Sequence, residues 1–201
     1  ERLGAGIDTL DFSALVAPVQ FGFRLAGMLV TSGLGVLTVS GTLTGTGIEN
    51  WLGGLGEDTL DFSADNSGRV IRLVGLGTLD GFSGTVSGGY SFDNIDLLVG
   101  SSGVDSLYGL DQVSEWQINA GAGVYHPGGQ SQTLGFAGME SIYGGSGVDV
   151  FDMYGTVAIQ LNGGGAADRF IIRDGVVLRG LVDGGTGVDR LDWSGYTSGR
   201  A

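Results

Sequence analysis

The fold of this chain is decided by a short glycine-rich motif, whose clearest copy reads Gly144-Gly145-Ser146-Gly147-Val148-Asp149-Val150-Phe151. Two further clean copies cover residues 53–60 and 184–191, and looser copies end at Asp8, Asp105 and Asp168. A strand-like tail follows, because residues 9–14 and 59–64 both read TLDFSA and residues 191–194 read LDWS. The repeated unit is therefore a short strand, a glycine turn that ends in Asp, and a second short strand.

The spacing of the motif indicates how these units are arranged. Asp149, Asp168 and Asp189 follow one another at intervals of 19 and 21 residues, which is the length of one coil. The longer gaps earlier in the chain suggest two coils each, with degenerate turns at 33–35, 75–80 and 121–123. One coil cannot bury its apolar face alone, whereas stacked coils share a continuous core.

The sequence therefore predicts an all-β fold, a right-handed parallel β-solenoid of the β-helix or β-roll kind. We expect about nine coils of roughly 20–25 residues each. Residues 1–201 should form a single segment of a longer array, or one repeat unit of a filament. Alternation predicts that Leu60 and Phe62 share one face of a strand, with Leu10/Phe12 and Leu191/Trp193 in the same register.

An antiparallel sandwich or propeller is the alternative fold. Such folds favour two-residue hairpin turns built on Asn-Gly or Asp-Gly. The dipeptides of this kind are Asp80-Gly81, Asn162-Gly163, Asp174-Gly175 and Asp183-Gly184.

Composition narrows the class of protein. The chain has 42 glycines among 201 residues, and glycine in a helix interior costs about 1 kcal/mol relative to alanine, so helices should not build the core. The formal net charge of −13 argues against partners that need a cationic surface, namely nucleic acid and anionic membranes. No apolar stretch is long enough to insert into a bilayer, and the absence of Cys excludes disulfides.

The glycine turns resemble the Gly-Gly-x-Gly-x-Asp nonapeptide of the repeats-in-toxin family, and the TLDFSA tails resemble repeats of very large bacterial surface and adhesin-like proteins. The first resemblance implies a parallel β-roll with calcium between consecutive loops. Only Asp149, Asp168 and Asp189 are consecutive at coil spacing, so they are the candidate calcium ligands. The alternative is that each Asp closes its own turn, and this alternative is favoured for Asp8, Asp58 and Asp105. The departure from the family is that its nonapeptides run in unbroken tandem, whereas here they stand apart.

The sequence offers little support for an enzyme. The only histidine, His126, lies beside Pro127 in a glycine-rich stretch and is expected to be a loop residue. Paired carboxylates such as Asp149/Asp152 recur with the repeat, whereas a catalytic pair is normally singular. We therefore expect no catalytic residues and no organic cofactor.

We expect a structural or adhesive extracellular module of a large bacterial surface protein, whose copies stack end to end into fibres. Calcium is the one cofactor expected, and surface glycans are the other candidate partners. The alternatives are a calcium-binding folding or secretion module of a secreted toxin or enzyme, and a polysaccharide-binding or polysaccharide-cleaving β-helix.

Overall fold

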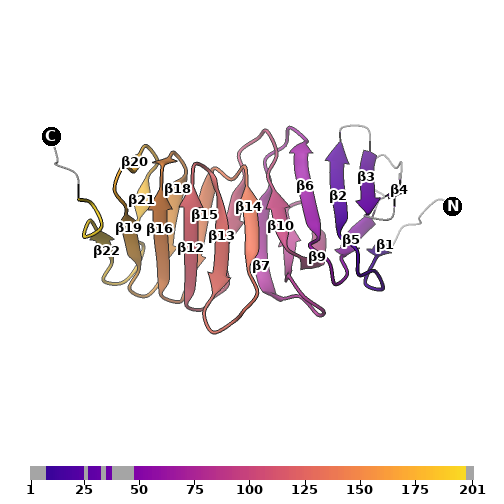
Figure 1. Ribbon diagram of the computed structural model, residues 1–201, viewed down its shortest axis with the longest axis horizontal. Helices are drawn as coiled ribbons and strands as arrows, with labels where there is room; N and C mark the ends of the chain where they lie inside the picture. Colours follow the sequence, from indigo (N-terminus) through magenta and orange to yellow (C-terminus); the bar gives the residue numbers. More distant parts are fainter. Residues whose placement is uncertain (1–7, 25–26, 33–34, 38–47, 198–201) are drawn as a thin grey trace. The chain divides into compact units, whose positions relative to one another are not determined.

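The computed structural model describes residues 8–24, 27–32, 35–37 and 48–197, in which every regular element is a β-strand (Figure 1). The chain divides into two compact units, Glu1–Asp105 and Ser106–Ala201. The expectation of a single segment within a longer array stays a prediction.

The first unit contains two sheets of mixed strand direction. In the β5 sheet the order is β1 (Asp8–Asp11), β5 (Ile48–Leu52), β9 (Tyr90–Ile95), β8 (Phe82–Val86) and β7 (Val70–Leu76). In the β6 sheet it is β10 (Leu97–Val99), β6 (Thr59–Ala64), β2 (Val19–Arg24), β3 (Gly27–Ser32) and β4 (Gly35–Leu37). Strands β1, β5 and β9 pair in parallel, as do β10, β6 and β2, while β7–β8–β9 and β2–β3–β4 are antiparallel.

The second unit has two main sheets and a small third one. The β15 sheet holds β11 (Ser106–Tyr108), β15 (Ser141–Gly145), β18 (Gln160–Gly164) and β21 (Val182–Asp183), all parallel. In the β16 sheet the order is β22 (Arg190–Asp192), β19 (Arg169–Ile172), β16 (Asp149–Tyr154), β12 (Ser114–Asn119), β13 (Ala122–Pro127) and β14 (Leu134–Ala137). Its last two strands run antiparallel to their neighbours. Strands β17 (Thr156–Val157) and β20 (Val177–Leu178) form the third sheet.

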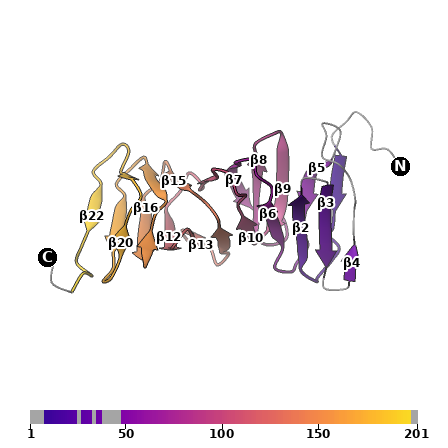
Figure 2. The same cartoon turned by 90° about the horizontal axis from the view of Figure 1, so that it is seen from above.

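The prediction of one right-handed parallel β-solenoid of about nine coils is wrong. Three sheets, named here after β5, β6 and β16, each contain parallel and antiparallel strand pairs. Figure 2 shows the strands of the first unit in two layers, the β5 sheet and the β6 sheet. Antiparallel excursions occupy the intervals that the sequence assigned to missing coils. The predicted descriptions of the fold as a β-helix, a β-roll or a solenoid are therefore wrong as well.

The turns between the strands explain why the chain does not form a continuous coil. The predicted turn at 75–80 falls where β7 ends and the chain turns back into the antiparallel β8. Ala120-Gly121 joins β12 to β13, with φ angles of 51° and 82° at these two positions. Positive φ at both central residues is the geometry of a tight hairpin turn, so the chain reverses there instead of continuing a coil. The remaining predicted turn, at 33–35, lies partly outside the described residues.

The dipeptides that suggested hairpins mark other features. Asp80-Gly81 lies in the antiparallel β7–β8 connection. Asn162-Gly163 lies inside β18, which pairs in parallel with both of its neighbours. Asp174-Gly175 lies in the connection between β19 and β20, and Asp183-Gly184 stands at the end of β21, where the chain leaves for β22 in the other sheet.

The core of the second unit is organised as a column of side chains across the β16 sheet. The register places Trp116, Phe151, Phe170 and Leu191 side by side on successive strands. The first three rings are stacked, with centroid distances of 6.0 and 4.8 Å and interplanar angles of 5° in both pairs. They are buried, whereas Leu191, at the end of the column, is 45% exposed.

Candidate functional site

The three predicted calcium ligands come together in the second unit, each directly after a glycine turn. The backbone N–H of Asp149 donates to Oδ1 of Asp168 at 2.8 Å, and the N–H of Asp168 donates to Oδ1 of Asp189 at 3.0 Å. The carboxylates of Asp168 and Asp189 therefore each link their own turn to the turn before it. We call this arrangement of Asp149, Asp168, Asp189 and their glycine turns the aspartate turn stack.

The glycines of the motif make this close stacking possible. The N–H of Gly165 donates to Gly145 O at 2.9 Å, and the N–H of Thr186 donates to Gly164 O at 2.8 Å. A Cβ atom on Gly164 would lie 2.2 Å from Gly145 O, and one on Gly144 would lie 2.4 Å from Oδ2 of Asp149. Any side chain at these positions would push the turns apart, so the glycines are required by packing.

Two carboxylate oxygens of the stack lack a hydrogen bond. Oδ2 of Asp149 and Oδ2 of Asp168 are buried, and neither has a hydrogen-bond partner among the described residues. Burial raises the pKa of Asp149 to about 7, and the charge of Asp168 acts in the same direction. Burial also raises the pKa of Asp168, helped by the charge of Asp189. Both groups therefore favour the protonated form more than an exposed Asp does.

The bonding in the stack bears on how well calcium fits. A calcium ion needs six to eight oxygen ligands, but Oδ1 of Asp168, Oδ1 of Asp189 and the carbonyls of Gly145 and Gly164 already accept backbone N–H groups. Among the described residues, no group of three or more His, Cys, Asp or Glu side chains is arranged to hold a metal ion. This arrangement favours turn closure, and calcium binding stays a prediction.

The motif Asp residues of the first unit also close turns. Asp58 is fully buried, and it accepts the N–H of Val19 on Oδ1 and the N–H of Gly54 on Oδ2, both at 2.6 Å. Asp8 differs, because it begins β1 and its N–H donates to the carboxylate of Glu49.

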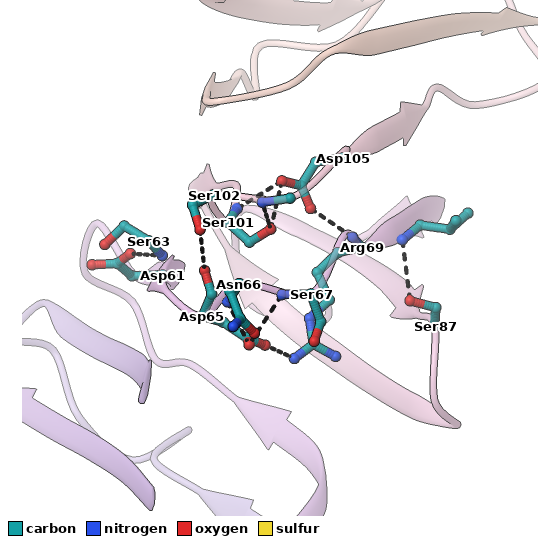
Figure 3. A network of polar contacts seen from close by, with 12 residues as sticks. Asp61, Ser63, Asp65, Asn66, Ser67, Arg69, Ser87, Ser101, Ser102 and Asp105 are labelled. Atoms are coloured by element: carbon teal, nitrogen blue, oxygen red, sulfur yellow. Dashed lines mark hydrogen bonds and ion pairs between the residues drawn. The ribbon is translucent and has the colours of Figure 1, made fainter. Parts of the chain in front are cut away.

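Figure 3 shows the arrangement around Asp105. Oδ1 accepts the N–H of Arg69 at 2.6 Å, and Oδ2 accepts the N–H and the hydroxyl of Ser101 at 2.8 and 2.9 Å. The guanidinium of Arg69 in turn forms an ion pair with Asp65, whose carbonyl accepts the N–H of Ser102 at 3.0 Å. The loop 65–69 is thereby fastened to the turn at 101–105.

In the acidic pairs of the second unit, Asp149/Asp152 and Asp189/Asp192, the second carboxylate has a different role from the first. Asp149 accepts the indole N–H of Trp116 in the core, whereas Asp152 takes two hydrogen bonds from Arg173 at 2.7 and 2.6 Å. Asp192 accepts Nε of Arg169 at 2.8 Å. The members of a pair thus serve separate interactions, and the expectation that the chain is not an enzyme stays a prediction.

His126 does not lie in a loop. It belongs to β13, where the register places it opposite Glu115 of β12. The sequence missed this position because the surrounding Pro and Gly are typical of loops.

One end of the second unit carries exposed apolar side chains. Strands β21 and β22 are the last strands of their sheets in this unit, and four large apolar side chains near them are exposed: Leu181, Val188, Leu191 and Trp193. Val188 is 85% exposed and Leu181 is 62% exposed. An edge strand with unpaired backbone groups and exposed apolar side chains is a site for pairing with another strand.

Comparison of the chain with models of protein families, with characterised proteins and with solved structures gave no match. The resemblance to glycine-rich repeats therefore stays a prediction. The described residues contain no helix that could span a membrane.

Proposed function

We propose that this chain is a structural module of an extracellular bacterial surface protein that associates with further copies of itself through open sheet edges. The observation that carries the proposal is the end of the second unit, where the column of Trp116, Phe151 and Phe170 continues into a Leu191 that is 45% exposed. A further strand laid along β22 would complete both the sheet and the core column.

The acidic motif supports a structural role over a catalytic one. Its carboxylates accept backbone N–H groups from neighbouring turns, as Asp58, Asp105, Asp168 and Asp189 all do. Such bonds satisfy buried backbone donors and fix the turns. A general acid or base needs to face a substrate, and these groups face the backbone instead.

A second candidate function is a calcium-dependent folding module. The observation that favours it is the pair of buried oxygens, Oδ2 of Asp149 and Oδ2 of Asp168, that have no hydrogen-bond partner among the described residues. Buried oxygens without donors are the kind of group that a cation satisfies.

One experiment separates the two candidates. The purified chain is chelated exhaustively, and its mass is measured by light scattering over a range of concentrations, without and with millimolar calcium. Folded particles whose mass rises with concentration in both conditions would support the structural proposal. A chain that folds only with calcium would support the second candidate, and a folded monomer at every concentration would refute the proposed self-association.

A further inference from the structure

Two tyrosines lie next to each other on the outer face of the β15 sheet. Strands β11 and β15 pair in parallel, and their register places Tyr108 directly opposite Tyr143. The residues that precede them, Leu107 and Ile142, are fully buried. Because side chains alternate along a strand, both tyrosines point away from the core, and each is partly exposed.

The two phenol rings are held face to face. Their centroids are 4.2 Å apart and their planes differ by 4°. The backbone fixes this contact, because the N–H of Gly109 donates to Tyr143 O at 2.9 Å directly after the pair. The next strand places Asn162 opposite Tyr143, and the amide of Asn162 donates to Asp183. A polar side chain therefore borders the pair on that side of the sheet.

Other tyrosines of the chain meet groups of a different kind. Tyr125 is fully buried against Trp116. Tyr154 is 40% exposed, and the guanidinium of Arg173 lies over its ring. A phenol ring stacked on a second phenol ring is chemically distinct from these contacts, because oxidation can join two phenols to each other.

We propose that Tyr108 and Tyr143 form an oxidative modification site, at which a haem peroxidase acting with hydrogen peroxide joins the two rings as dityrosine. Each phenol loses one electron and one proton, and hydrogen peroxide takes up both electrons and both protons and becomes two molecules of water. The two radicals then couple through a carbon ortho to each hydroxyl. The hydrogen on each of these carbons moves to the phenol oxygen of its own ring, which restores both phenols.

The strand pair suits this reaction. Neighbouring strands lie about 4.8 Å apart, so the backbone can stay in place while the rings tilt until their edges meet. Holding the two rings together also makes their coupling intramolecular, which favours it over coupling between separate chains. The inference does not rest on the proposed self-association, because both rings belong to one chain.

The bond would link distant parts of a chain that lacks the usual groups for covalent links between side chains. The sequence contains no Cys for a disulfide and no Lys for an amide link. Tyr108 and Tyr143 are 35 residues apart, so the bond closes a long loop and restricts the unfolded chain, as a disulfide does. The melting temperature of the second unit should rise by roughly 5–10 °C.

Oxidation of the purified chain tests the site. The chain is treated with hydrogen peroxide and a haem peroxidase, and dityrosine is detected by its fluorescence and by the loss of two hydrogen atoms from the mass. Digestion at acidic residues locates the bond, because Asp111 and Glu140 lie between the two tyrosines. We expect a cross-linked product that joins residues 106–111 to residues 141–149, in a chain that runs as a monomer on a denaturing gel.

Tyrosine variants provide the matched comparison. Tyr108→Phe and Tyr143→Phe keep the stacked rings and remove one phenol, so each should lower the yield of dityrosine about tenfold or more. The control is Tyr154→Phe, which makes the same change at a more exposed tyrosine outside the pair and should leave the yield within about twofold. Circular dichroism establishes that each variant is folded.

Two results would overturn the modification site. One is a chain without dityrosine after oxidation. The other is dityrosine that persists in Tyr108→Phe or occurs only in covalent dimers, because the bond would then join other tyrosines or separate chains. A bond mapped to Tyr108 and Tyr143 would support the site, and an unchanged melting temperature would then overturn its stabilising role. The self-association proposed above is judged separately, by light scattering of the untreated chain.

Discussion

Two stretches of the first unit have the same sequence and different environments. Residues 8–14 and 58–64 both read DTLDFSA. The first copy forms β1, which pairs with β5, whereas the second forms β6, which lies between β10 and β2 in the other sheet. Leu60 and Phe62 are buried, and Leu10 and Phe12 are only half-buried.

The leading Asp of the two copies differs as well. Asp58 is buried and accepts two backbone N–H groups, while Asp8 begins an edge strand and donates its own N–H to Glu49. One local feature is common to both copies. Asp11 accepts the N–H of Ser13 at 2.8 Å, and Asp61 accepts the N–H of Ser63 at 2.8 Å. Sequence therefore determines the local turn, and the neighbouring strands determine burial.

The largest expected difference between the copies lies in their apolar side chains. Leu60→Ala should lower the free energy of unfolding by about 2–5 kcal/mol, because it leaves a cavity in the core. Leu10→Ala should cost about 1 kcal/mol, since a half-buried side chain loses less contact. Urea unfolding measures both. Equal losses would contradict the different burial of the two copies.

The sequence predicted the turns better than their connections. The intervals of 19 and 21 residues between the motif Asp residues correctly brought Asp149, Asp168 and Asp189 into neighbouring turns. The sequence could predict these neighbouring turns because the number of residues between them and the hydrogen-bonding capacity of Asp are local properties of the chain.

The sequence could not predict whether neighbouring strands are parallel or antiparallel. Residues 114–119 alternate between buried and exposed side chains, and that pattern is the same whether a neighbour is parallel or antiparallel. In the structure, β12 has one neighbour of each kind. The reversal depends on Ala120-Gly121: the sequence predicts a turn at 121–123, but Ala at positive φ is uncommon, so the sequence does not show that this turn reverses the chain. The exposure of Leu191 likewise depends on the absence of a neighbouring strand among the described residues.

A smaller effect on stability is expected from Asp96, whose carboxylate contacts the second copy, residues 58–64. The N–H of Asp58 donates to Oδ2 of Asp96 at 2.8 Å. Burial raises the pKa of Asp96 to about 6, and the charges of Asp80 and Asp58 act in the same direction. Between about pH 4 and pH 6 the folded chain therefore holds more protons than the unfolded chain, and its stability falls as the pH rises through this range.

Asp96→Asn keeps an acceptor for the N–H of Asp58 but cannot ionise. It should remove about 1–2 kcal/mol of the loss in stability between about pH 4 and pH 8, a value reduced for the partial exposure of Asp96. Urea unfolding at a series of pH values measures the slope, with Asp183→Asn as the control for net charge. A slope identical to that of the wild type would show that Asp96 is not the group responsible.

The smallest effect tests what the two copies share. Asp11→Ala and Asp61→Ala each remove one hydrogen bond to a backbone N–H at a turn, and each should cost about 0.5–1 kcal/mol. Because Asp61 also accepts Nε2 of Gln20 at 2.7 Å, its substitution is best compared in a Gln20→Ala background. The two losses should then agree within about 0.5 kcal/mol, even though the leucines beside them differ severalfold. A neutral Asp11→Ala paired with a costly Asp61→Ala would mean that the turn, too, depends on the surrounding sheet, and that identical sequence fixes less of this fold than its shared hydrogen bond indicates.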